Sequence, residues 1–300
     1  MLKKLIKKKL IRFLSLIEKG SLTICFPDQQ THTFKGKQAG PNANICVNNW
    51  RVFSNLAFKG DIGFAEDFRD GHWTTSNLTD LLCFAVDNEK TLQHYIHGNF
   101  IHRKLSALLY ASKRNTIKNS KKNIHAHYDL GNDFYHLWLD PSMTYSSAIF
   151  ESQDQTLNQA QQNKYQHILN KLPQSGHILE VGYGWGGFAK QALESGSYQY
   201  KGITLSHAQQ SFAQQHLPSS ATVALEDYRI QEGQYDMIVS IEMIEAVGKA
   251  YWSNYFQKLK ALLKPKGTIM IQSILIADAL FDGYDKGSDM IRTYIFPGGM

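Results

Sequence analysis

The chain has 300 residues and a formal net charge of +6, with 43% hydrophobic and 19% charged residues. This balance excludes disorder over most of the length, and no apolar stretch is long enough to span a bilayer. The cysteines Cys25, Cys46 and Cys83 are scattered without a CxxC spacing, which argues against a disulfide frame or a zinc site.

Residues 1–19 predict an amphipathic helix, because apolar residues recur at helical spacing and the basic residues lie mostly on the other side. Such a helix either lies on anionic lipid or packs on its own domain, and the sequence leaves both open. The segment lacks the apolar core and small-residue cleavage site of a signal peptide. We therefore expect a cytoplasmic protein that associates peripherally with a membrane.

Short β-like segments within residues 21–58 and a loop-and-helix pattern over 60–97 predict a small α+β domain over 1–100. Residues 101–122 follow as a basic helical connector without acidic residues, glycine or proline. A charge run of this kind is usually a solvated face, although an anionic phospholipid surface would suit it. We do not expect nucleic acid as a partner, since no zinc-finger, RRM-type or KH-type signature appears.

From residue 165 the pattern alternates between apolar strands and helices. Strands are predicted at 177–181, 200–204, 221–225, 236–240 and 268–272, with helices at 187–195, 206–216 and 249–263. This alternation predicts an α/β fold with a parallel sheet and helices on both faces. Ligands of such sheets bind at the carboxyl ends of the strands, where the strand order reverses.

The turn after the first of these strands reads Gly182-Tyr183-Gly184-Trp185-Gly186-Gly187. Such glycines let the backbone turn tightly and approach a ligand, but NAD enzymes use a similar run. Glu180, just before the turn, suits the ammonium of an amino-acid ligand, and no acidic residue closes the second strand as in NAD enzymes. Asp227, after the third strand, could accept from an adenine amino group. These details favour S-adenosyl-L-methionine.

Several longer motifs resemble the cyclopropane-fatty-acyl-phospholipid synthases and the related mycolic acid methyltransferases. The matching segments are 127–135, 137–140, 143–146, 202–206 with Gln209, 240–248 and 294–299, and 60–66 with 70–73 resemble the N-terminal domain of the longer members. The resemblance covers residues 20–300. It implies a Rossmann-like class I methyltransferase domain over 123–300 behind the α+β domain.

The resemblance implies a reaction on the unsaturated fatty acyl chains of phospholipid. The alkene attacks the sulfonium methyl group, a carbocation forms, and loss of a proton from the new methyl closes a cyclopropane ring. A carbocation must be kept from water, and aromatic faces can stabilise it. Candidate aromatic residues, each of which is by default a core residue, are Phe134, Tyr135, Trp138, Tyr145 and Phe296.

The family's site residues carry over position by position. Its cofactor contacts correspond to Tyr145, Ser146, Gly182, Gly184, Thr204, Leu205, Gln209, Asp227 and Ile241, beside the Glu180 already noted. Its base is a bound bicarbonate, and the ligands of that ion correspond to Ser147, Glu245, Gln272 and the backbone of Ile274. The family usually has cysteine at the position of Ser147 and histidine at that of Gln272. Proton handling therefore differs, and a methyl- or methylene-branched product is the alternative.

The chain ends within the last motif, at 297–300, so we expect a truncated protein whose sheet lacks a final antiparallel pair. His125, His127 and Asp129 have a spacing that suits no known zinc pattern, and we expect no metal. A homodimer is compatible with the resemblance. Two other functions stay open: a non-catalytic lipid-binding homologue, and a methyltransferase for nucleic acid or a small molecule.

Overall fold

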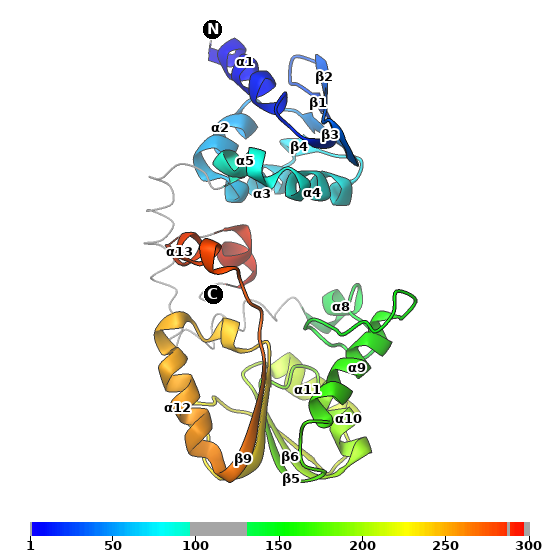
Figure 1. Cartoon of the computed structure of the whole chain (residues 1–300), viewed down its shortest axis with the longest axis vertical. Coiled ribbons are helices and arrows are strands. Elements are labelled where there is room, and N and C mark those ends of the chain that lie inside the picture. Colours follow the sequence, from blue (N-terminus) through cyan, green and yellow to red (C-terminus); the bar gives the residue numbers. More distant parts are fainter. Residues whose placement is uncertain (1, 97–130, 287–288, 297–300) are drawn as a thin grey trace. The chain divides into compact units, whose positions relative to one another are not determined.

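The computed structural model describes residues 2–96, 131–286 and 289–296 and divides into two compact units (Figure 1). The first comprises 1–110 with 282–294, and the second comprises 111–281 with 295–300. The predicted basic connector at 101–122, together with His125, His127 and Asp129, lies outside the described residues. Residues 282–294 differ from the prediction, which assigned them to the methyltransferase domain: their contacts are with the first unit.

The first unit is built on a four-stranded sheet. Its strands are β1 (Lys19–Cys25), β2 (Thr31–Lys35), β3 (Gln38–Val47) and β4 (Trp73–Thr74), in the order β2-β1-β3-β4. Strands β1 and β3 pair in parallel, and the other two pairs are antiparallel. The helices are α1 (Leu2–Leu14), α2 (Arg51–Lys59), α3 (Asp61–Arg69), α4 (Leu78–Asp87) and α5 (Glu89–Ile96).

The amphipathic helix α1 packs its apolar side on the core of its own unit. Leu10 and Leu14 are buried in the cluster that also contains Phe26. On the polar side, Lys7 pairs with Asp28 at 2.9 Å, and Lys8, Lys9 and Arg12 are exposed. The packing alternative left open by the sequence is therefore realised, and the exposed basic side stays available to a partner.

A C-terminal segment returns to helix α3. Helix α13 (Asp278–Lys286) is followed by a short π-helical turn at Ile291–Ile295. The backbone N–H of Met290 donates to Asp61 Oδ2 at 2.9 Å, and the hydroxyl of Tyr294 donates to Glu66 Oε1 at 2.6 Å. These bonds join the return segment to the unit that begins the chain.

The second unit contains a fully parallel five-stranded sheet in the order β7-β6-β5-β8-β9. The strands are β5 (Ser175–Val181), β6 (Ser197–Thr204), β7 (Ala221–Leu225), β8 (Tyr235–Ile241) and β9 (Leu263–Gln272). Every predicted strand is present. The order reverses between β5 and β8, so a ligand site is expected where these two strands end.

Helices cover both faces of this sheet. The helices of this unit are α8 (Gly131–His136), α9 (Leu157–Leu169), α10 (Gly187–Ser195), α11 (His207–His216) and α12 (Trp252–Leu262), with short 3-10 turns at Ile244–Ala246 and Lys249–Tyr251. Tyr165 of α9 and Phe188 of α10 pack into one core cluster, and Leu259 of α12 packs into the other. None of the helices in the described ranges is long and apolar enough to span a bilayer.

Candidate active site

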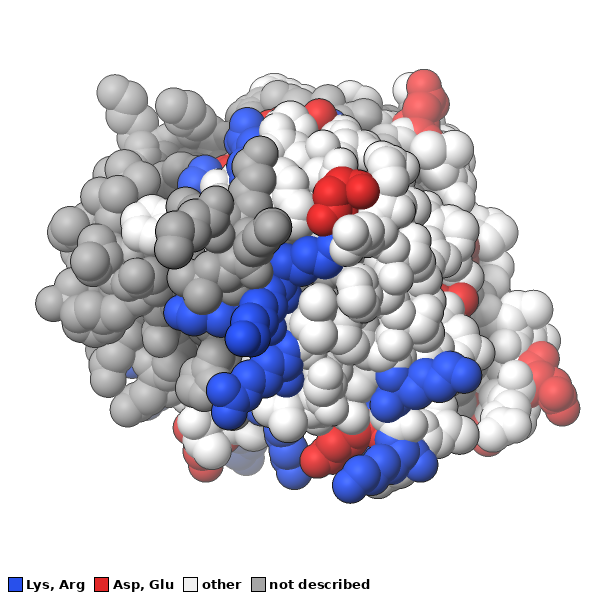
Figure 2. Space-filling view, turned by 90° about the horizontal axis from the view of Figure 1, so that it is seen from above, with Lys and Arg blue, Asp and Glu red and all other residues white. Residues whose placement is uncertain are grey.

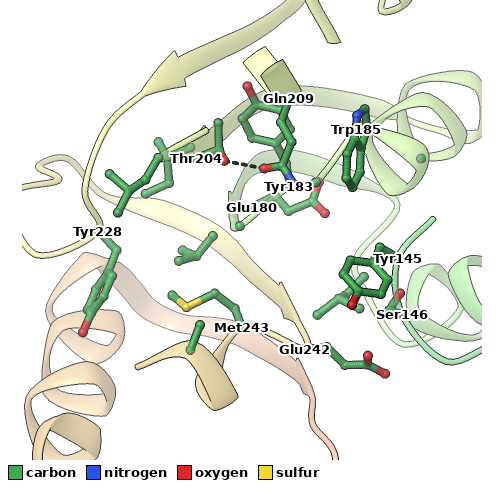
Figure 3. A pocket seen from close by; sticks show the side chains of 18 of the residues that line it. Tyr145, Ser146, Glu180, Tyr183, Trp185, Thr204, Gln209, Tyr228, Glu242 and Met243 are labelled. Atoms are coloured by element: carbon green, nitrogen blue, oxygen red, sulfur yellow. Dashed lines mark hydrogen bonds between the residues drawn. The ribbon is translucent and has the colours of Figure 1, made fainter. Parts of the chain in front are cut away.

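A pocket lies at the carboxyl ends of β5, β6 and β8, where the strand order reverses (Figure 3). All ten residues predicted to contact the cofactor line it: Tyr145, Ser146, Glu180, Gly182, Gly184, Thr204, Leu205, Gln209, Asp227 and Ile241. They come from separate strands and loops, and the sheet topology brings them to one edge. Tyr145, Ser146 and Glu242 lie together on one side of the pocket (Figure 3).

The glycine-rich turn leaves room for a ligand. Gly182 and Gly184 have positive φ angles of 82° and 59°, which residues with a side chain rarely adopt. A Cβ on Gly182 would lie 2.9 Å from Met243 Cγ, whereas one on Gly184 would meet no atom within 4 Å. The hydroxyl of Tyr183, also on the pocket wall, is buried without a hydrogen-bond partner in the described part of the chain. Open space beside an unsatisfied hydroxyl fits S-adenosylmethionine.

Glu180 is a buried carboxylate at the end of β5, with 2% of its surface exposed. Burial raises the pKa of its carboxyl to about 7, opposed by the hydrogen bond from the Tyr200 hydroxyl and by the charge of Lys164. A cationic ligand group would favour the ionised form of such a carboxyl. The position therefore suits the ammonium group expected from the sequence.

The other predicted cofactor contacts are held by neighbours. The Thr204 hydroxyl donates to Gln209 Oε1 at 2.7 Å (Figure 3), and Ser206 caps helix α11 by accepting from the Gln209 backbone at 3.3 Å. Asp227 also faces Arg229, whose Nε donates to Asp227 Oδ1 at 2.9 Å. The sequence did not predict this ion pair, which leaves fewer free lone pairs on Asp227 for an adenine amino group.

Helix α9 holds the loop that carries Tyr145 and Ser146. Gln161 Nε2 donates to the Ser146 carbonyl at 2.7 Å, and Lys164 Nζ donates to Ser146 Oγ at 2.5 Å. Lys164 is 1% exposed, and burial lowers its pKa to about 8. Neither residue was predicted from the sequence. Their spacing of three on an otherwise apolar helical face was the available signal.

Of the five aromatic candidates, Tyr145 alone is on the pocket wall. The rings of Trp138 and Phe296 lie 5.2 and 6.2 Å from the Tyr145 ring. Tyr135 is buried in the cluster with Met143 and Trp185, so it packs as a core residue, and Phe134 is 41% exposed. The Tyr145 ring is thus backed by the rings of Tyr135, Trp138 and Phe296. The other aromatic residues that line the pocket are Tyr165, Tyr183, Trp185 and Tyr228.

The four predicted catalytic residues form two pairs beside the pocket. Ser147 and Gln272 both bind Glu242 Oε1, at 2.5 Å from Ser147 Oγ and 2.8 Å from Gln272 Nε2. Glu245 accepts a hydrogen bond from the backbone N–H of Ile274, and burial raises the pKa of its carboxyl. The donors expected to hold bicarbonate are therefore already bound to carboxylates of the chain. In this arrangement the residues do not fit a bicarbonate ion.

Glu242 itself was missed as a site residue. It lies within the 240–248 motif and lines the pocket, yet its role depends on partners 95 and 30 residues away in the sequence. No cluster of three potential metal ligands occurs among the residues that the structure describes.

Comparison with known proteins places these observations in a family. The model of the family "Mycolic acid cyclopropane synthetase" matches residues 115–300. Tuberculostearic acid methyltransferase UfaA1 of Mycobacterium tuberculosis is 33% identical over 80% of this chain and 59% of its own length. Cyclopropane-fatty-acyl-phospholipid synthase of Escherichia coli strain K12 is 33% identical over 86% of this chain and 66% of its own length.

Among solved structures, the mycolic acid cyclopropane synthase CmaA1 complexed with SAH and CTAB matches with a TM-score of 0.52 and 33% identity. The match covers 60% of this chain and 68% of that protein. The chain thus spans about two thirds or less of the length of the two curated relatives.

Proposed function

The chain belongs to the mycolic acid cyclopropane synthetase family, and we propose that it methylates the double bond of an unsaturated fatty acyl chain to form a cyclopropane ring. The observation that carries the proposal is the pocket at the strand-order reversal, along which all ten predicted cofactor residues lie. S-adenosylmethionine, when bound, supplies an electrophilic methyl group on its sulfonium. The protein's task is to orient this donor and to exclude water.

The chain's own residues divide this task. The glycine-rich turn allows close approach of the cofactor, and Glu180 offers a buried negative charge for its ammonium group. Tyr145, backed by Trp138, presents aromatic surface that stabilises a cation on the substrate. Residues 274–276, which follow closely after β9, are apolar and exposed, and they supply surface for an acyl chain.

The substrate class is phospholipid at an anionic membrane surface. Support comes from the net charge of +6 and from the exposed Lys8, Lys9 and Arg12 on α1. Figure 2 shows a face on which Lys and Arg side chains form a band with mostly uncharged residues beside it. Each basic residue near an anionic surface contributes about 1 kcal/mol to binding. Peripheral attachment would bring the pocket to its substrate without a membrane-spanning helix.

A second product is favoured by a specific observation. Ser147 and Gln272 lack the thiol and imidazole of the expected base site. If no base reaches the new methyl group, the cation loses a proton from a chain carbon, and a methylene-branched acyl chain results. A later reduction would give the methyl-branched chain.

The test is incubation of the purified protein with methyl-labelled S-adenosylmethionine and vesicles of unsaturated phospholipid. We expect label in the acyl chains and one S-adenosylhomocysteine per methyl transferred, with vesicles of saturated phospholipid as the inactive control. NMR of the hydrolysed fatty acids separates cyclopropane protons from those of a methylene branch. Label that enters RNA and not lipid would contradict the proposal, and so would absence of transfer.

A further inference from the structure

The carboxylate of Glu242 is fixed by three donors on one of its oxygens. Oε1 accepts from the Ser147 backbone N–H at 2.9 Å, from Ser147 Oγ at 2.5 Å and from Gln272 Nε2 at 2.8 Å. The backbone takes part as well, since the Glu242 N–H donates to the Gln272 carbonyl at 2.8 Å. The loop that carries Ser147, the end of β8 and the end of β9 therefore meet at the Glu242 carboxylate.

The other oxygen of Glu242, Oε2, is free to accept a proton. Oε2 receives no hydrogen bond from the described residues, and the side chain is half-buried on the pocket wall beside Tyr145 and Ser146. A base needs this combination: one oxygen that sets its position, one that accepts a proton, and contact with water through which the proton can leave.

The backbone of Glu242 is strained. Its φ angle is +48°, in the left-handed region that residues with a side chain adopt at a cost of roughly 1–3 kcal/mol. A glycine would take this conformation freely. Backbone strain of this kind clusters at functional sites, where surrounding contacts maintain it. Here the contacts from Ser147 and Gln272 hold the carboxylate of this residue in place.

We propose that Glu242 is the built-in base of the reaction and occupies the place expected for a bound bicarbonate. Its Oε2 takes a proton from the new methyl group of the methylated acyl cation. The electron pair of the broken C–H bond forms the bond to the cationic carbon, so the ring closes and the charge is cancelled. Glu242, now neutral, returns the proton to water before the next turnover. This inference rests on the proposed lipid methylation.

The first measurement compares product formation in CO2-free buffer with and without added bicarbonate. We expect wild-type activity to be the same in both. Glu242→Gln keeps the shape but not the base, so ring formation should fall by at least about a hundredfold while cofactor affinity is unchanged. Glu151→Gln, which removes an exposed carboxylate, is the matched control. Wild-type activity that requires bicarbonate, or an active Glu242→Gln variant, would overturn the proposal.

The second variant is Glu242→Gly, which relieves the positive φ and leaves the donors of Ser147 and Gln272 facing an empty space. We expect it to be inactive alone and to regain activity with millimolar formate or bicarbonate. Calorimetry gives a readout independent of activity: Glu242→Gly should bind formate, whereas the wild type and Glu242→Gln should not. Formate binding to the wild type would overturn the assignment of this position to Glu242. If the wild type transfers no methyl group to lipid, the proposed function fails. Calorimetry still decides whether the Glu242 carboxylate or a bound anion occupies the position between Ser147 and Gln272.

Discussion

At the scale of single residues, Glu180 places a carboxyl where it can bind a ligand but where burial destabilises its charged form in the ligand-free protein. It sits at the end of a central strand with 2% of its surface exposed, and the Tyr200 hydroxyl and Lys164 compensate only part of its desolvation. Such an arrangement is typical of a group whose full partner arrives with a ligand. Without a ligand, the protein should therefore be less stable than a variant with a neutral side chain at position 180.

The variant Glu180→Gln tests whether burial of the Glu180 carboxyl lowers the stability of the ligand-free protein. Because burial raises the pKa of Glu180 from 4.5 to about 7, the folded state binds more protons than the unfolded chain between these values. The free energy of unfolding therefore falls as pH rises through that window. We expect the neutral variant to exceed the wild type by up to about 3 kcal/mol at pH 8, and to lose this advantage below pH 4.5. Urea unfolding across this pH range measures it.

The same variant should bind S-adenosylmethionine about tenfold more weakly at pH 8, because it lacks the charge that faces the ammonium group. Glu194→Gln, on the exposed end of α10, is the control and should change neither quantity. If the stability of Glu180→Gln relative to wild type were the same at pH 8 and at pH 4, the pKa of Glu180 would not be raised in the folded protein.

At the scale of elements, helix α9 packs into the core on one side and holds a loop of the pocket on the other. It begins with a capping box between Thr156 and Gln159, and Tyr165 anchors it in the core. Its polar residues Gln161 and Lys164 then point at the Ser146 loop, which carries one wall of the pocket. The helix thus sets the position of a loop that has little regular structure of its own.

We expect Gln161→Leu to weaken binding of S-adenosylmethionine by roughly five- to tenfold, because the Ser146 carbonyl loses its donor and the loop shifts. Stability should change little, since Gln161 Oε1 is buried without a partner in the described structure and the substitution removes it. Titration calorimetry and thermal unfolding measure the two effects. Thr156→Ala is the control: loss of the cap should cost about 1 kcal/mol of stability and leave affinity intact. Equal affinity losses in both variants would mean that helix stability, not position, matters.

Elements were the part of the fold most readable from sequence. The five strands of the parallel sheet occur where alternation predicted them, and α10 spans the predicted residues 187–195. Helix α2 was missed because it lies in a stretch read as short strands and turns. The partners of Glu242 were missed for another reason: Ser147 and Gln272 are distant in sequence, and only the sheet order brings them together. Motifs indicated the members of the site, but hydrogen-bond pairing required tertiary structure.

At the scale of the whole molecule, two units with different tasks share one chain. The second unit holds the pocket, and residues 282–294 return from it to join helix α3 of the first. The first unit has a complete core of its own, in which α1 participates through its apolar side. The exposed basic side of α1 takes no part in this core. Its charges can therefore be changed without disturbing the fold, and it is available as a surface for recognition.

The exposed basic side of α1 can be tested by charge reversal. The variant Lys8→Glu/Lys9→Glu/Arg12→Glu reverses three exposed charges on α1. We expect binding to vesicles of mixed anionic and neutral phospholipid to weaken about a hundredfold, since each basic residue near such a surface contributes about 1 kcal/mol. The binding of the wild type should also weaken as salt rises, because ions screen the attraction. Sedimentation with vesicles at low and high salt measures both effects.

A matched control separates position from net charge. Lys171→Glu/Lys190→Glu/Lys260→Glu reverses three exposed lysines on the second unit and gives the same total charge. If α1 is the attachment surface, this control should bind vesicles nearly as well as the wild type, and both variants should bind S-adenosylmethionine normally. Equal losses in the two variants would instead mean that the overall positive charge attracts the protein to lipid without a defined face. Methylation of vesicle lipid should follow vesicle binding in each case, because an acyl chain can enter the pocket only from a membrane that the protein has reached.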